Sequence, residues 1–316
     1  MNNELNRIDE FAHKKDLIDW WYFGALLDKT DTKISEWTFI SNFVIARGFV
    51  DNLVCILIPP NESPIDLSGW GLKAGSIKAK TKELNVTCQN NNWVTGGYPE
   101  WHVHMEQSKD KHAYIIDLKF KAEVDSNWRR YEKDTSYLNH FAVFRQRVSG
   151  TLIIDGESFD VSGVAYYEQM SGFIDPKVSR GWYWYCVPQT YAGDISMNIA
   201  LGMTPEDEIY HQFIYFTEDG KEFVEFLNFK FEVLEEKSFK NVNYPFKFRV
   251  SEKNENGEIE AIVTRASNPT QDMHDTPFGT VAFITGIAHV EGKIVWKGKE
   301  YNISGRSIGS NFLIVF

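Results

Sequence analysis

The sequence of 316 residues has few cysteines and no long apolar run. Its three cysteines, Cys55, Cys88 and Cys186, include no Cys-x-x-Cys pair, which argues against a disulfide framework and against a structural zinc site. No stretch approaches the roughly 18 apolar residues of a membrane span, so we expect no membrane-spanning segment. The first 16 residues are polar and lack the apolar segment of a secretory signal, which favours a cytoplasmic location.

The sequence also lacks an excess of positive charge. It has 33 Lys and Arg against 44 Asp and Glu, a net charge of −11, which disfavours nucleic acid as a partner. There is no Gly-x-Ser-x-Gly elbow, no phosphate-binding loop and no dinucleotide fingerprint. We therefore expect no cofactor.

Helical periodicity is scarce, because few segments keep it for three turns. Many short β-type runs separated by turn residues indicate an all-β sandwich or barrel instead. The charged segment Glu123–Tyr137 is predicted to be a loop. Aromatic residues are abundant, at 15% with 10 Trp. Two interpretations remain open for them: the core of a β-rich fold, or the lining of a pocket for an apolar ligand.

One hairpin pattern occurs twice in the chain. Asp155-Gly156 is a strong two-residue turn signal between the apolar run Thr151–Ile154 and the returning segment Ser158–Tyr167. The segment Val148–Gly163 aligns without a gap with Val290–Gly305. The identical positions are Val148, Gly150, Gly156, Ser162 and Gly163, which recur as Val290, Gly292, Gly298, Ser304 and Gly305. The repeat predicts two tandem β-barrel domains, at residues 1–172 and 173–316.

The two copies diverge just after the repeat, where only the first carries a carboxylate. Tyr166 and Glu168 share one strand face, and Tyr167 lies on the other. A carboxyl group among aromatic rings is desolvated, which favours its neutral form and suits a general acid, and the rings can stabilise a carbocation. The alternative is a surface carboxylate at the end of a strand. Glu168 and Tyr166 are the candidate catalytic residues, with Tyr167 and Met170 as candidate substrate-binding residues.

Two aromatic strands supply the other candidate pocket residues. Trp182 and Trp184 point the same way on the strand that follows Gly181, and Trp20 and Tyr22 near the N-terminus are additional candidates for lining the pocket. They either line a ligand pocket or belong to the structural core.

A third motif contains His102, His104 and Glu106 on alternate positions of one strand. This spacing is compatible with metal ligation, but the carboxylate lies too close to match the His-x-His pair of cupins. The alternative is a solvated polar strand face. We assign no metal site, and we include His104 as a candidate acid–base and substrate-contacting group at a cavity mouth.

These motifs together resemble the lipocalin-like hydroxyneurosporene synthase (carotenoid 1,2-hydratase, AttH-type) superfamily. Asp19-Trp20-Trp21-Tyr22-Phe23 looks like its entry strand, and the hairpin with Gly150, Gly156, Gly163, Ala165 and Glu168, followed by Gly181-Trp182-Tyr183-Trp184, looks like its central motif. The resemblance implies two tandem lipocalin-like antiparallel β-barrels and an apolar ligand. It also implies an activity such as carotenoid hydration or Diels–Alder-type cyclisation.

The sequence departs from the hydratase pattern beside the acid. Where the family commonly has Asp-His-x-Trp-Gly, this chain has Glu168-Gln169-Met170-Ser171-Gly172, so the acid is kept but the His and Trp neighbours are lost. Water addition needs a proton donor and surroundings that stabilise a cation, whereas a cyclase needs mainly a shaped apolar cavity.

We therefore expect a cofactor-independent cyclase or isomerase acting on a long apolar polyene, polyketide or terpenoid. The alternatives are a carotenoid-type hydratase that uses Glu168 as acid, a non-catalytic carrier of hydrophobic ligands, and a metal enzyme that uses His102 and His104.

Overall fold

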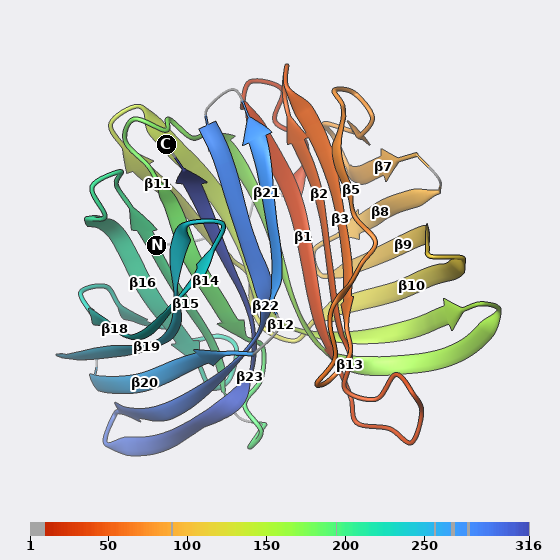
Figure 1. Cartoon of the computed structure of the whole chain (residues 1–316). Helices are drawn as coiled ribbons and strands as arrows, with labels where there is room; N and C mark the ends of the chain where they lie inside the picture. Colours follow the sequence, from red (N-terminus) through yellow and green to blue (C-terminus); the bar gives the residue numbers. More distant parts are fainter. Residues whose placement is uncertain are drawn as a thin grey trace. The chain divides into compact units, whose positions relative to one another are not determined.

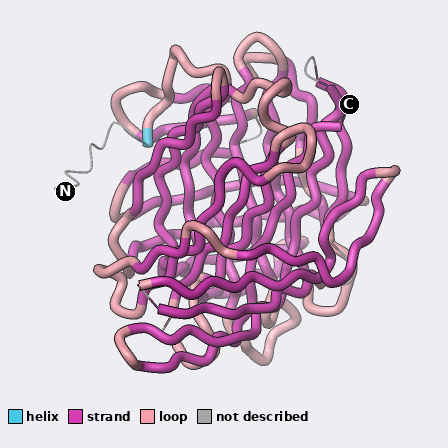
Figure 2. Tube along the Cα trace, turned by 90° about the vertical axis from the view of Figure 1, so that its left-hand side faces the viewer, coloured by secondary structure: helices cyan, strands magenta, loops and turns pink. Residues whose placement is uncertain are grey.

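The computed structural model describes residues 10–89, 91–193, 195–255, 257–266, 269–276 and 279–315, nearly all of them in β-strands and turns (Figure 2). No α-helix occurs in these ranges. None of the described segments is therefore a helix of the length and apolarity needed to cross a membrane.

The chain divides into two compact units, Met1–Ile174 and Asp175–Phe316. The strands of the first unit (Figure 1) are β1 Ile18–Leu27, β2 Thr38–Ala46, β3 Val50–Ile58, β4 Ile65–Asp66, β5 Gly69–Lys73, β6 Lys78–Ala79, β7 Leu84–Cys88, β8 Asn92–Gly97, β9 Glu100–Lys109, β10 His112–Ala122, β11 Asn127–Lys133, β12 Ser136–Ile154 and β13 Glu157–Phe173. The strands of the second unit are β14 Gly181–Val187, β15 Ser196–Met203, β16 Ile209–Thr217, β17 Val224–Phe226, β18 Lys230–Phe239, β19 Val242–Asn254, β20 Gly257–Arg265, β21 Thr270–Thr276, β22 Gly279–Trp296 and β23 Lys299–Val315.

The first unit is one curled antiparallel sheet in the order β4-β3-β2-β1-β13-β12-β10-β9-β8-β7-β6, with β5 paired to β3 and β11 to β12. The strands β7–β10 run at a steep angle to β1–β3 (Figure 1), which brings the two ends of the sheet toward each other. Polar contacts link these ends: Lys109 Nζ donates to the carbonyl of Asp66 at 3.0 Å, and the Ile77 amide donates to Asp51 at 2.9 Å. The segment predicted to be a loop was assigned wrongly, because β11 pairs with β12 along its whole length.

Aromatic side chains fill the concave side of this sheet. The ring of Tyr167 lies 4.5 Å from that of Phe23, 4.8 Å from that of Trp101 and 6.1 Å from that of Phe141. Glu10 reaches into the same cluster, where it accepts hydrogen bonds from the Trp101 indole at 2.7 Å and the Tyr98 amide at 2.8 Å. One side of β1, β12 and β13 therefore belongs to the core, and the other side is left for the site described below.

The second unit repeats this plan with fewer strands. Its sheet has the order β17-β16-β15-β14-β23-β22-β20-β19-β18, with β21 paired to β22. Tyr183 and Tyr185 of β14 belong to its hydrophobic core, so Trp182 and Trp184 lie on the opposite face of that strand.

The duplicated hairpins have the same turn. Asp155-Gly156 joins β12 to β13 with φ values of 53° and 84°, and Lys297-Gly298 joins β22 to β23 with values of 50° and 74°. Two consecutive positive φ values are the signature of a type I′ turn, which matches the twist of the flanking strands. Both hairpins predicted from the sequence are confirmed.

Only the first hairpin contains a bulge. From the turn inward, β12 and β13 pair in one register as far as Gln146 and Ala165, and the register shifts by one residue before Val143 and Tyr167. β22 and β23 pair without a shift from Trp296 to Thr280. A one-residue shift exchanges the faces of a strand, so the two hairpins present different side chains beyond this point.

Gly292 and Gly298 of the second hairpin allow a test of how closely its strands approach the neighbouring strand. A Cβ at Gly292 would lie 2.1 Å from the carbonyl oxygen of Glu260 and 2.6 Å from the Cα of Ala261, both backbone atoms of the paired strand, whereas Gly298 has open space around it. We expect Gly292→Ala to lower the free energy of unfolding by about 3 kcal/mol or more, because the strands must separate. Gly298→Ala should cost only about 1 kcal/mol, the cost of a left-handed Ala. Urea denaturation measures both, and equal losses would contradict the close strand approach.

Candidate active site

A polar cluster occupies the face of β1, β12 and β13 that points away from the aromatic core of the first unit. Glu168 is at its centre, on β13 between its paired neighbours Tyr22 on β1 and Ala142 on β12. Strand alternation puts Trp20 and Tyr22 of β1, and Tyr166 and Glu168 of β13, on this face. The sequence pattern predicted the shared face of Tyr166 and Glu168.

Donors surround the Glu168 carboxylate. Trp20 Nε1 donates to Oε1 at 3.2 Å, and the Tyr166 hydroxyl donates to Oε2 at 2.6 Å. His140 Nε2 lies 3.0 Å from the same Oε2 and 3.3 Å from the Tyr166 hydroxyl. Glu168 is 7% exposed and His140 4%. Since an indole can only donate, Glu168 acts as the acceptor at the centre of the cluster.

His140 connects this carboxylate to a second phenol. The Tyr131 hydroxyl lies 3.2 Å from His140 Nδ1, on the side of the ring away from Glu168. If Nε2 carries the proton, Tyr131 donates to Nδ1; if both nitrogens are protonated, Tyr131 accepts. The order Tyr131–His140–Glu168 is thus a short path along which a proton can pass.

Sequence reasoning missed His140 and Tyr131. Both lie about 30 residues or more before Glu168 in the sequence. His140 faces Glu168 only because of the bulge in β12. His140 from β12 and Trp20 from β1 bring an imidazole and an indole to the acid. These are the two groups that the sequence beside Glu168 has lost.

The remaining candidates on β13 divide between two faces. Met170, 7% exposed, is paired with His140 and lies on the face of the cluster. Tyr167 lies in the aromatic core, where burial and the Glu10 carboxylate raise its pKa well above the ordinary value of a phenol. The Tyr167 phenol therefore stays neutral. Because Tyr167 lies on the core face of β13, the structure does not bring its ring to Glu168.

Trp182 and Trp184 belong to the second unit, where their pairing makes them the counterparts of Trp20 and Tyr22. Trp182 pairs with Phe312 and Trp184 with Ser310, as Trp20 pairs with Met170 and Tyr22 with Glu168. The ring of Trp182 stacks on that of Phe312 at 4.3 Å. The second unit has Ser310 in place of the acid.

His104 lies in a separate cluster. His102 Nε2 lies 2.8 Å from Asp117 Oδ1, and His104 Nδ1 lies 2.8 Å from Asp117 Oδ2. The Trp93 ring stacks on the His104 ring at 5.2 Å. Burial alone would raise the pKa of Asp117, but the hydrogen bonds from His104 and His102 lower it below its usual value. Among the described residues, no three or more His, Cys, Asp or Glu side chains are placed to hold a metal ion.

The strand pairing separates His104 from Glu168. His104 pairs with Asp117, Asp117 with Thr151, and Thr151 with Asp160 of β13. Glu168 lies eight residues further along β13, roughly 26 Å at the rise of a strand. The structure therefore does not bring His104 to the acid.

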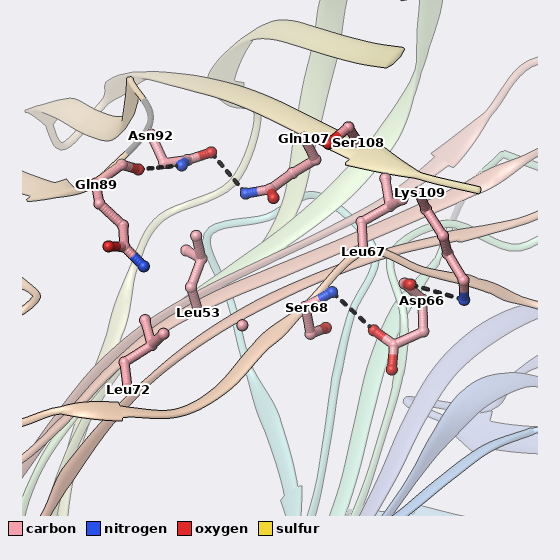
Figure 3. Close-up of a pocket in the computed structure, with 11 residues that line it drawn as sticks. Leu53, Asp66, Leu67, Ser68, Leu72, Gln89, Asn92, Gln107, Ser108 and Lys109 are labelled. Atoms are coloured by element: carbon pink, nitrogen blue, oxygen red, sulfur yellow. Dashed lines mark hydrogen bonds between the residues drawn. The ribbon is translucent and has the colours of Figure 1, made fainter. Parts of the chain in front are cut away.

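A cavity of about 340 Å³ lies between the two ends of the first sheet (Figure 3). Most of its lining is polar, and Asn92 links two other members of it: its Nδ2 donates to the carbonyl of Gln89, and its Oδ1 accepts from Gln107 Nε2 at 2.9 Å. The lining residues are Leu53, Asp66, Leu67, Ser68, Gly69, Leu72, Gln89, Asn92, Gln107, Ser108 and Lys109. This cavity is distinct from the Glu168 cluster.

No family model matches the chain, and no curated protein matches its sequence. Several solved structures are similar in fold. An AttH-like protein from Nitrosomonas europaea is 14% identical with a TM-score of 0.72, over 99% of this chain and 97% of that one. Kievitone hydratase from Nectria haematococca is 12% identical with a TM-score of 0.70, over 94% of this chain and 88% of that one. CghA in complex with Sch210972 is 9% identical with a TM-score of 0.59, with the same coverage.

These likenesses confirm the predicted fold class, all-β with two tandem lipocalin-like antiparallel barrels. They show that the chain shares its fold with an AttH-like protein, with kievitone hydratase and with CghA.

The Glu168 cluster should contribute to stability. Replacing Glu168 by Leu removes the acceptor that the Trp20 indole and the Tyr166 hydroxyl share, and the loss of buried hydrogen bonds to a charged group is costly. We expect the free energy of unfolding to fall by at least about 2 kcal/mol. The control is Glu157→Leu, an exposed carboxylate on the same strand, with an expected change below about 1 kcal/mol. Equal losses of unfolding free energy for the two substitutions, measured by urea denaturation, would contradict a stabilising role of the Glu168 hydrogen bonds.

Proposed function

We propose that the protein is an enzyme that transforms an apolar small molecule by proton transfer at the Glu168 cluster. The proposed reaction is the cyclisation or isomerisation of a polyene, polyketide or terpenoid, without a redox cofactor. The observation that supports this proposal is the buried carboxylate of Glu168, whose Oε2 contacts both a phenol and an imidazole. The corresponding position of the second unit is Ser310.

The roles follow from what each group can donate or accept. Since Glu168 already accepts hydrogen bonds, the proton that initiates the reaction comes from His140, and the proton that Glu168 gains at the end of the cycle returns to His140 across the 3.0 Å contact between Oε2 and Nε2. Addition of this proton to one alkene carbon leaves a cation on the next carbon. A second alkene attacks that cation and closes a ring, and Glu168 accepts the proton that the product loses. The net change is an isomerisation, so no oxidant or reductant is required.

Aromatic rings beside the acid would stabilise the cationic intermediate. Tyr22 and Tyr166 lie edge to face at 6.3 Å, and Trp20 stands on the same face. The negative faces of such rings attract a cation when water is excluded.

Hydration is the second candidate. It uses the same proton donor, but a water molecule attacks the cation and Glu168 accepts a proton from the water oxygen. The loss of His and Trp beside the acid argued against it, and the supply of an imidazole and an indole by His140 and Trp20 removes that objection. A hydratase, kievitone hydratase, is among the proteins of similar fold.

Substitution of Glu168 by Gln tests the proposal, because Gln keeps the shape of the side chain but cannot accept the proton. The probe is the apolar molecule that mass spectrometry identifies in an organic extract of the purified protein. We expect turnover of this molecule to fall by about 10²-fold or more, with little change in affinity. Glu157→Gln on the same strand should leave turnover unchanged. Wild-type binding without turnover would identify a carrier and refute the enzyme.

Turnover in D₂O separates the mechanisms. Proton-initiated cyclisation and hydration both place deuterium on carbon, and only hydration adds the mass of water. Conversion without deuterium would indicate a purely conformational, pericyclic cyclase and would contradict the role of His140.

A further inference from the structure

A cavity of about 400 Å³ lies in the second unit, between β14–β16 near one end of its sheet and β18–β19 at the other. Its volume is within the range of small-molecule sites. The residues that line it, from these strands and the turns beside them, are Arg180, Tyr183, Leu201, Met203, Asp207, Ile209, Phe231, Val233, Glu236, Asn241, Asn243 and Pro245.

The floor of this cavity is apolar, and its rim is open to solvent. Tyr183, Leu201 and Met203 are buried, whereas Ile209 and Val233 at the rim are each 40% exposed. The ring of Tyr183 lies 6.0 Å from that of Phe231, so two aromatic side chains stand together in the wall. A ligand can therefore enter from solvent and bury an apolar body against this floor.

The charged side chains of the lining leave one carboxylate unpaired. Arg180 Nη1 donates to Asp207, so these two charges neutralise each other. Glu236 is exposed and forms no ion pair within the described ranges. Arg265, the buried cation of this unit, does not line the cavity. With one positive and two negative side chains, the lining has a net charge of −1, which favours a cation as ligand.

A bulge in β18 turns Glu236 toward the cavity. Phe231 and Val233 line it at alternate positions, so regular alternation would place Glu235 there next. The register with β19 shifts between Val233 and Glu235, where β18 has one residue more than its partner strand. Such a shift exchanges the faces of a strand, and Glu236 lines the cavity in place of Glu235. Bulges that redirect a side chain are frequent beside functional sites.

The Tyr183 phenol lies within the influence of this carboxylate. Burial is the main cause of the raised pKa of Tyr183, and the charge of Glu236 adds to it. The Tyr183 hydroxyl therefore stays protonated, and it has no hydrogen-bond partner in the part of the chain that the structure describes. A carboxylate and a phenol oxygen are both acceptors, and an ammonium group has three donors and no acceptor.

We propose that the second unit binds a small hydrophobic amine in its protonated form. The apolar body of the amine lies on Leu201 and Met203, and its ammonium group donates to Glu236 and to the Tyr183 hydroxyl. The rings of Tyr183 and Phe231 also attract a cation. This ligand site is separate from the proposed reaction, because it lies within the second unit and shares no residue with the Glu168 cluster.

Isothermal titration calorimetry of the full chain with 4-phenylbutylamine tests this site. The comparison ligand is 4-phenylbutan-1-ol, which has the same apolar body and no charge. At neutral pH we expect the amine to bind at least about 5-fold more tightly than the alcohol, because a charge-assisted hydrogen bond forms only with the ammonium group. Equal affinities, tighter binding of the alcohol, or no saturable binding of the amine would overturn the proposal.

Two neighbouring carboxylates allow a matched comparison. Glu236→Gln should remove the preference for the amine, while the alcohol binds as before. Glu235→Gln removes the same charge one residue away, at an exposed position that does not line the cavity, and should preserve the preference. An unchanged preference in Glu236→Gln would overturn the role of this carboxylate. Equal losses in the two variants would show a general attraction of amines to an acidic surface and would also overturn the proposal.

Val233→Trp tests whether the apolar body enters the cavity. Val233 belongs to the exposed rim, so a larger side chain there narrows the opening and leaves the core of the unit unchanged. We expect this variant to bind both the amine and the alcohol more weakly. Unchanged affinities would show that the apolar body lies elsewhere and would overturn the proposal.

Discussion

The pairing of β13 with β1 on one side and β12 on the other is the constraint on which the first unit depends. Backbone hydrogen bonds fix which residues stand opposite each other, and strand alternation then sends them to one face or the other. Tyr167 is committed to the aromatic core, and its neighbours Tyr166 and Glu168 are committed to the opposite face. The core and the proposed active site are therefore two sides of the same three strands, and neither can be repacked without the other.

The duplication gives two units of one plan with different polar groups. In the first unit the face away from the core carries Glu168 and His140, and in the second the corresponding position of the acid is Ser310. The core of the second unit has the buried cation Arg265 instead. One copy thus places its unusual polar groups on the face of the sheet away from its aromatic core, and the other places Arg265 within its core.

The sequence was sufficient for both hairpins, but it missed strand β11 and did not specify the register of β12. Paired glycines and turn dipeptides predicted both hairpins, and alternation put Tyr166 and Glu168 on one face. Counting back from the Asp155-Gly156 turn without a bulge would pair His140 with Ser171, on the core side. The observed pairing is with Met170, because β12 contains one extra residue between Val143 and Gln146. No residue type in that segment specifies the bulge, so the imidazole beside the acid could not be foreseen. Arg265 was missed for a related reason, since its burial depends on strands brought together from the whole unit.

The same sheet order has a consequence for synthesis on the ribosome. Ile18 of β1 pairs with Gly172, and Gly181 of β14 pairs with Leu313. The opening strand of each unit must therefore wait for more than a hundred further residues before its second neighbour emerges. During that interval an apolar strand has one unpaired edge, which exposes the nascent chain to wrong pairing and makes these contacts slow to form. Translation speed and chaperone access between residues 27 and 157 should therefore influence how much of this protein reaches its native state.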